Sequence, residues 1–172
     1  FKPRQPLPSR PQRAVFFSNY AGQDGALLAV LREACEAEGI ALDLLGESAG
    51  NRRVDPESLL GAYDLVFAKG KCAIEALATG CAVIVCHDRP GPLVTSLNME
   101  VCRQWNFGLR LATSPREVDV VRREIRLYDA DDAACVSGFV RERCVLDVAV
   151  SAYVGLYDEV MAEPLPAPGD GE

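Results

Sequence analysis

The sequence has little of what several common kinds of functional site require. It contains a single histidine, His87, and its seven cysteines form no Cys-X-X-Cys pair. A zinc site or a disulfide framework is therefore disfavoured, and reduced, packed thiols are the better interpretation. The Walker loop and the patterns GxGxxG, HExxH and GxSxG are also missing. Their absence removes the main support for nucleotide hydrolysis, for a simple Rossmann dehydrogenase and for a serine hydrolase.

Basic charge and long apolar runs are scarce as well. Lysine and arginine number 18 against 25 acidic residues, which gives a net charge of -7 and no basic stripe. This balance argues against a nucleic-acid partner, because phosphates need cations around them. No apolar run approaches the length of a membrane span, so no transmembrane segment is expected. Small molecules and proteins remain as partners, and we expect a cytoplasmic protein.

The composition predicts one folded domain with two flanking segments. Residues 1–13 (FKPRQPLPSRPQR) are proline-rich and lack the layout of a signal peptide, so we expect an interdomain linker within a longer polypeptide. Residues 14–163 are long enough for a sizeable core, with 49% hydrophobic residues in the chain. Residues 164–172 (PLPAPGDGE) are expected to be a disordered tail.

The apolar pattern predicts strands that alternate with helices. Short apolar runs at 14–18, 40–45, 65–68 and 81–86 predict buried strands. Helices are predicted from about Asp24 to Gly39, after Asp55-Pro56, over 72–79, from Ser96 to Trp105, and from the capping box at 114–117 to about 161. Residues 87–96 are expected to be a loop, and short strands are possible within 46–54 and 109–111. The predicted fold is a three-layer, Rossmann-like α/β domain with a parallel sheet and helices on both faces.

This topology predicts where a ligand binds. If the chain returns to the centre of the sheet, strands 14–18 and 65–68 become neighbours. Ligands of such sheets bind outside the carboxyl ends of the strands at this switch point. The loops there carry Asn19 and Gly22 after the first strand, and Lys69-Gly70-Lys71 after the later one.

The residues Lys69, Gly70 and Lys71 have a chemistry suited to phosphate. The glycine permits close backbone approach, the following helix start favours an anion, and the lysines add positive charge. The alternative is a solvated loop. Glu75 lies four residues after Lys71 and could form a surface pair worth about 0.3–0.5 kcal/mol, or it could accept hydrogen bonds from a ribose. The residues alone favour an exposed glutamate.

Two further features follow the strand at 81–86. His87 and Asp88 could act as acid and base, but adjacent residues rarely face each other, so a catalytic role is disfavoured. Residues 89–96 contain a glycine and hydroxyl groups before a helix, which would supply a second set of backbone amides to the same crevice. A rigid proline-rich turn is the alternative.

The segment from Asp64 to Ile84 resembles the carboxyl-terminal domain of GT-B glycosyltransferases, especially the glycogen-synthase-like retaining group. Gly70, the run Ile-Glu-Ala-Leu-Ala at 74–78, Gly80 and Ala-Val-Ile at 82–84 stand where that group has its glycine, Leu-Glu-Ala-Met-Ala, Gly and Pro-Val-Ile. Asn-Phe-Gly at 106–108 is similar to its Asn-Gly. The likeness in motif covers residues 64–95.

The resemblance implies a domain that binds a nucleotide-diphosphate sugar as donor substrate, without a metal or other cofactor. Glu75 would bind the ribose hydroxyls. The diphosphate and sugar would face the amides after Gly70 and those around Gly91, Pro92, Leu93, Val94 and Thr95. The family's active site lies between two domains, and the amino-terminal acceptor domain is missing here. This chain alone should then bind donor weakly and transfer nothing.

Two departures from the family pattern bear on this interpretation. The family's first glutamate, eight residues before Glu75, is Phe67 here, and the basic residues that follow the family's first strand are absent from residues 19–25 (NYAGQDG). Lys69 and Lys71 could supply that charge. A nucleotide-sugar epimerase of the same fold remains an alternative, as does a noncatalytic doubly wound module for small-molecule binding or signalling.

Overall fold

A five-stranded sheet forms the centre of the molecule. The structure, a computed structural model, describes residues 3–18, 25–46, 57–144 and 146–163. The strands are β1 (Arg13–Phe17), β2 (Ala41–Leu45), β3 (Leu65–Ala68), β4 (Ala82–Cys86) and β5 (Pro90–Leu93), in the order β2-β1-β3-β4-β5. The first four are parallel, and β5 pairs with β4 in the antiparallel sense. The predicted return to the centre is confirmed, because β1 lies between β2 and β3.

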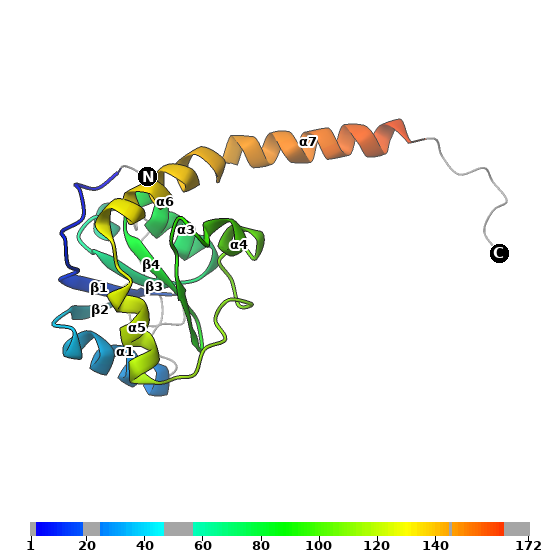
Figure 1. The fold of residues 1–172 in the computed structure, drawn as a ribbon. Helices are drawn as coiled ribbons and strands as arrows, with labels where there is room; N and C mark the ends of the chain where they lie inside the picture. Colours follow the sequence, from blue (N-terminus) through cyan, green and yellow to red (C-terminus); the bar gives the residue numbers. More distant parts are fainter. Residues whose placement is uncertain (1–2, 19–24, 47–56, 145, 164–172) are drawn as a thin grey trace, which may run out of the picture.

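Helices cover both faces of this sheet, which confirms the three-layer α/β prediction (Figure 1). On one face lie α1 (Gly25–Ala37) and α5 (Val118–Arg126); on the other lie α2 (Glu57–Leu60), α3 (Gly70–Thr79), α4 (Met99–Gln104) and α6 (Ala130–Arg143). Successive strand residues point to opposite faces. Phe16 and Phe67 therefore pack toward α1 and α5, whereas Val15 and Val66 pack toward α3 and α6.

Several predicted boundaries are wrong. Helix α3 begins at Gly70, two residues before the predicted start, and the expected loop at 87–96 contains β5. Residues 109–111 form turns where a strand was thought possible. The predicted capping box does not form, because Glu117, not Ser114, is the residue before α5. The predicted strand within 46–54 and the Asp55-Pro56 helix start lie almost wholly outside the described residues.

The long closing helix predicted from 114 to 161 is divided into α5, α6 and α7 (Leu146–Ala162). The break before α6 has a clear cause at Asp129. Its backbone is extended, and its side chain accepts hydrogen bonds from the amides of Asp131 and Asp132, each at 2.9 Å. This is an N-cap, which begins a new helix rather than continuing the previous one.

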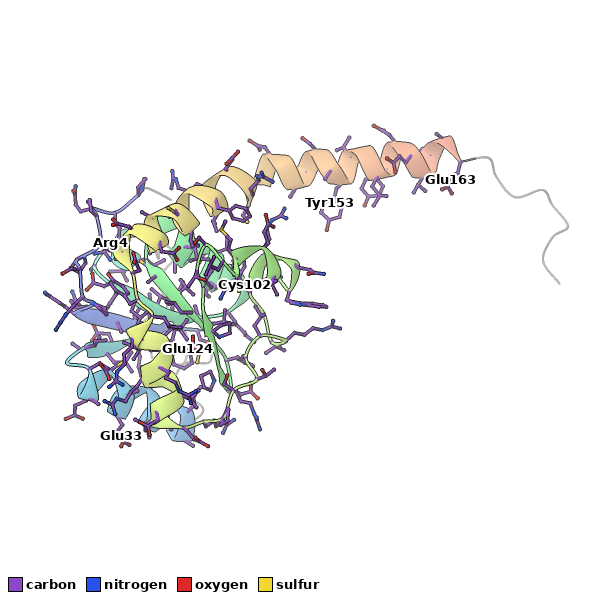
Figure 2. The ribbon with its side chains drawn as sticks, viewed as in Figure 1. Arg4, Glu33, Cys102, Glu124, Tyr153 and Glu163 are labelled. Atoms are coloured by element: carbon purple, nitrogen blue, oxygen red, sulfur yellow. The ribbon has the colours of Figure 1, made fainter. Side chains whose placement is uncertain are left out.

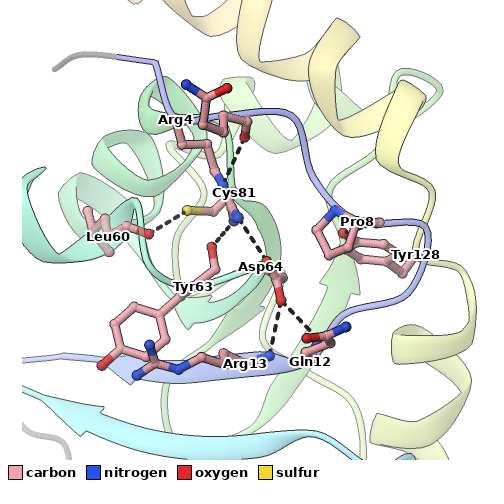
Figure 3. Close-up of polar contacts among 10 residues, drawn as sticks. Arg4, Pro8, Gln12, Arg13, Leu60, Tyr63, Asp64, Cys81 and Tyr128 are labelled. Atoms are coloured by element: carbon pink, nitrogen blue, oxygen red, sulfur yellow. Dashed lines mark hydrogen bonds and ion pairs between the residues drawn. The ribbon is translucent and has the colours of Figure 1, made fainter.

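The segment expected to be a linker packs against the amino-terminal edge of the sheet (Figure 3). The Arg4 guanidinium contacts an Asp64 carboxylate oxygen at 2.8 Å, and both side chains are about nine-tenths buried. The other Asp64 oxygen accepts hydrogen bonds from the amides of Gln12 and Arg13. At the far side, the Tyr128 hydroxyl donates to the Pro8 carbonyl at 2.9 Å. Residues 3–12 are therefore held on the domain.

Helix α7 leaves the body of the molecule and projects away from it (Figure 1). Tyr153 lies partway along this projection and Glu163 at its end (Figure 2). Among the described helices, α7 included, none combines the length and apolar character needed to cross a bilayer.

Candidate functional site

The carboxyl-terminal edge of the sheet brings Lys69 and His87 close together. Lys69 follows β3 and His87 follows β4, and these strands are neighbours. Burial lowers the pKa of His87, and the positive charge of Lys69 lowers it further, while Asp88 opposes this effect. Asn19 and Gly22, which the predicted topology places at the same edge, lie outside the described residues.

Gly70 has a backbone role at the start of α3. Lys69 is extended, and Gly70 then takes a φ of +53°, a left-handed value that side chains other than glycine rarely adopt. The Gly70 amide donates to the Phe107 carbonyl at 2.8 Å. This amide is therefore engaged within the protein, and the amides that the resemblance assigns to the diphosphate are those that follow it in the first turn of α3.

The partner of that amide belongs to an unusual turn after α4. Asn106 and Phe107 both have positive φ, 51° and 49°, although neither is glycine. The Phe107 amide donates to the Cys102 carbonyl at 2.7 Å, and the Phe107 ring is buried. Consecutive left-handed residues of this kind cost energy and often occur at functional sites. The only feature of the sequence that pointed to this turn is the resemblance of Asn-Phe-Gly at 106–108 to the family's Asn-Gly.

A groove of about 1110 Å³ lies beside α3, between α4, α6 and the first turns of α7. Buried and half-buried apolar side chains, among them Ile74, Phe107 and Val140, form part of its lining. Its charged side chains are mostly basic, and they come from three helices: Lys71, Arg103, Arg141 and Arg143. Glu75 contributes a carboxylate to this lining. We call this feature the α3 groove.

Glu75 is largely covered, although the residues alone favoured an exposed glutamate. Its side chain is 12% exposed, whereas that of Lys71 is 87% exposed. The Lys71 ammonium lies 3.6 Å from a Glu75 carboxylate oxygen, as the spacing of four residues on α3 allows. Nearby, the Arg141 guanidinium donates to the Ala78 carbonyl at 2.9 Å. The fold thus places one shielded carboxylate in a basic and apolar groove.

The amides of residues 93–95 do not supply the expected second set of donors. The Leu93 amide donates to Glu124, the Val94 amide to the Val83 carbonyl, and the Thr95 amide to the Asn98 side chain, each at 2.8 Å. Strand β5 runs antiparallel to β4, so it leads back from the carboxyl-terminal edge. The prediction that these three amides face the crevice is wrong, and Pro92 has no amide to offer.

Gly91 is present because the backbone packs tightly around it. A Cβ atom at this position would lie 2.6 Å from the Leu111 carbonyl oxygen and 3.1 Å from that of Val85. The glycine therefore lets residues 108–112 approach β5 closely. This packing accounts for the residue without any ligand.

Phe67 also has a structural explanation. It lies within β3, is fully buried, and is paired with Phe16 on one side and Ile84 on the other. A glutamate here would place an unpaired charge in the core. Helix α3 follows β3 almost directly. The residue eight positions before Glu75 therefore lies in a buried strand.

The described residues contain no group of three or more His, Cys, Asp or Glu side chains arranged to hold a metal ion. Comparisons of the chain with protein-family models, with curated proteins and with solved structures found no match.

Proposed function

We propose that this chain is the donor-binding half of a glycosyltransferase, and that it binds a nucleotide-diphosphate sugar along α3. The observation that carries the proposal is Glu75, a carboxylate that is 12% exposed in a groove whose other charged lining residues are basic. A carboxylate accepts hydrogen bonds from the two hydroxyls of a ribose, while the surrounding cations attract a diphosphate.

The fold is consistent with this proposal. Strands β1 and β3 are adjacent although β2 separates them in sequence, which creates the switch point where such sheets bind ligands. Lys69 lies at this edge and Lys71 lines the groove, so the two lysines flank the start of α3. Positive charge at a helix start, together with the positive end of the helix dipole, favours a leaving diphosphate.

A nucleotide-sugar epimerase would use the same features and differs in its reaction rather than in its donor. A noncatalytic module that senses a small anion would use the basic side chains without needing Glu75. The contribution of Glu75 to binding therefore distinguishes the two nucleotide-sugar enzymes from the anion sensor.

The test is calorimetric titration of this chain with UDP, GDP and ADP. We expect one nucleotide to bind weakly and the K69A/K71A variant to lose most of that affinity. R32A is the matched control, because Arg32 is an exposed cation on α1, on the opposite face of the sheet. Unchanged affinity in K69A/K71A, or no binding of any of the three nucleotides, would overturn the proposal.

A further inference from the structure

We propose that this chain forms a reciprocal homodimer in which the projecting helix α7 of each copy lies in the α3 groove of the other. This inference does not require a nucleotide ligand, but the groove is the one in which we propose that the donor binds, so a partner's α7 and a nucleotide sugar would exclude each other from it. It rests on the uncovered apolar surface of α7 and on the opposite charges of α7 and the groove.

The apolar side chains of α7 are exposed although they share one face of the helix. Val150, Tyr153, Tyr157 and Val160 follow a spacing of three and four residues, and they are between 49% and 70% exposed. Leu156 and Met161 border this face, at 54% and 84% exposed. At 100° per residue these six side chains fall within an arc of about 140° of the helix circumference. A contiguous apolar face of this kind marks an interaction surface.

The charges on α7 are all of one sign. Asp147, Asp158 and Glu159 are exposed on the helix, Glu163 follows its last residue, and no lysine, arginine or histidine occurs from 146 to 163. The surface that receives α7 should therefore be apolar at its centre and basic around it.

The α3 groove has these properties. Half-buried Ile74, Ala78 and Cys144 supply its accessible apolar lining above the buried Phe107 and Val140, and cations come from Lys71, Arg103 and Arg143 among others. Ala149 and Ala152 of α7 form part of the groove's own wall. The first turns of α7 already form a wall of this groove and the rest of the helix projects away, so a helix that occupies the groove would come from a second molecule. The small alanine side chains allow a second helix to approach closely.

Docking of α7 into the groove of a second copy is favoured over direct pairing of the α7 helices of two copies. Such a pair would bring acidic side chains together along its edges, with no cation on either helix to offset them. In the reciprocal arrangement the tyrosines of α7 enter an apolar groove and its acidic residues meet arginines. Each copy offers one helix and one groove, so a two-fold dimer closes on itself.

Sedimentation measurements over about 1–100 μM test this arrangement. We expect the wild-type chain to sediment as a dimer at the upper end of this range. Variant D158K/E159K, with a basic helix, and variant R103E/R143E, with an acidified groove, should each dissociate at least about 10-fold more readily. Both variants change exposed side chains, so circular dichroism should show them folded.

The two charge variants mixed in equal amounts provide the sharpest outcome. In the mixed pair the basic α7 meets the acidified groove, and the acidic α7 meets the unaltered groove, so a heterodimer should form with the wild-type affinity restored. R32E, on the opposite face, should leave the dimer unchanged. A wild-type chain that stays monomeric, a dimer insensitive to both charge variants, or a mixture that stays monomeric would each overturn the proposal.

Discussion

Replacing Asp64 by alanine is expected to destabilise the domain more than any other single change to the contacts of residues 3–12. Asp64 accepts a hydrogen bond from the Arg4 guanidinium at 2.8 Å and two more from the amides of Gln12 and Arg13, at 2.9 and 3.1 Å (Figure 3). D64A removes all three and leaves the Arg4 charge largely buried. Breaking a buried ion pair in this way costs about 3–5 kcal/mol.

The R4A variant should cost less, because the Asp64 carboxylate keeps its two amide donors. R4A removes the charged hydrogen bond to Asp64 and a further one from the guanidinium to the Tyr63 carbonyl, and we expect a total loss of about 1.5–3 kcal/mol. With a urea m-value of about 2 kcal/mol/M, D64A should lower the unfolding midpoint by about 1.5–2.5 M and R4A by about 0.8–1.5 M. D64N, which keeps one oxygen acceptor, should fall between wild type and D64A.

Urea titration followed by circular dichroism measures these midpoints. Equal effects of D64A and R4A would contradict the reasoning, because they would mean that the amides of Gln12 and Arg13 contribute no more than the hydrogen bond from Arg4 to the Tyr63 carbonyl. An effect of D64A below about 1 kcal/mol, typical of an exposed pair, would show that residues 3–12 are not held on the domain.

Three other predictions concern the thiols, an ion pair and a glycine. Burial raises the pKa of Cys81 to about 12, whereas Cys135 is exposed. Iodoacetamide should therefore modify Cys135 in the native protein and Cys81 only after unfolding, which mass spectrometry measures. Hydrogen bonds from Arg122 and then Arg126 hold the pKa of Glu38 below its usual 4.5. In urea titrations at several pH values, wild type should be more stable than E38Q at pH 7, and this advantage should disappear as the pH falls through the lowered pKa. G91A should lower the thermal midpoint by the equivalent of about 1–3 kcal/mol, because its methyl group would overlap the Leu111 carbonyl; an unchanged midpoint would contradict that packing.

The pattern of the sequence predicts the parallel part of the fold because each strand is a short apolar run followed by a helix. Gly80 ends α3 as predicted, with a left-handed φ of 99° and its amide bonded to the Leu77 carbonyl. Strand β5 was missed because Pro90-Gly-Pro-Leu is typical of a turn. Proline is tolerated there because β5 lies at the edge of the sheet, where not every amide needs a partner.

The α3 groove could be predicted only in part. Lys71 and Glu75 belong to one helix, and their spacing of four residues alone places them together. Arg141 and Arg143 lie about 70 positions further along the chain, and only the packing of α6 on α3 brings them to the same groove. The cover over Glu75 depends on the same long-range packing, which no local pattern reveals.

The central claim is that Glu75 binds a ribose, and comparing UDP with 2′-deoxy-UDP tests it most directly. If calorimetry identifies GDP or ADP as the ligand, the corresponding deoxynucleotide takes its place. We expect loss of the 2′-hydroxyl to weaken binding to the wild-type chain by about 10-fold or more, the worth of a charged hydrogen bond. In E75Q the two nucleotides should bind with nearly the same affinity, while E33Q, an exposed control on α1 (Figure 2), should behave as wild type. An equal preference for the ribose form in wild type and E75Q would contradict the claim.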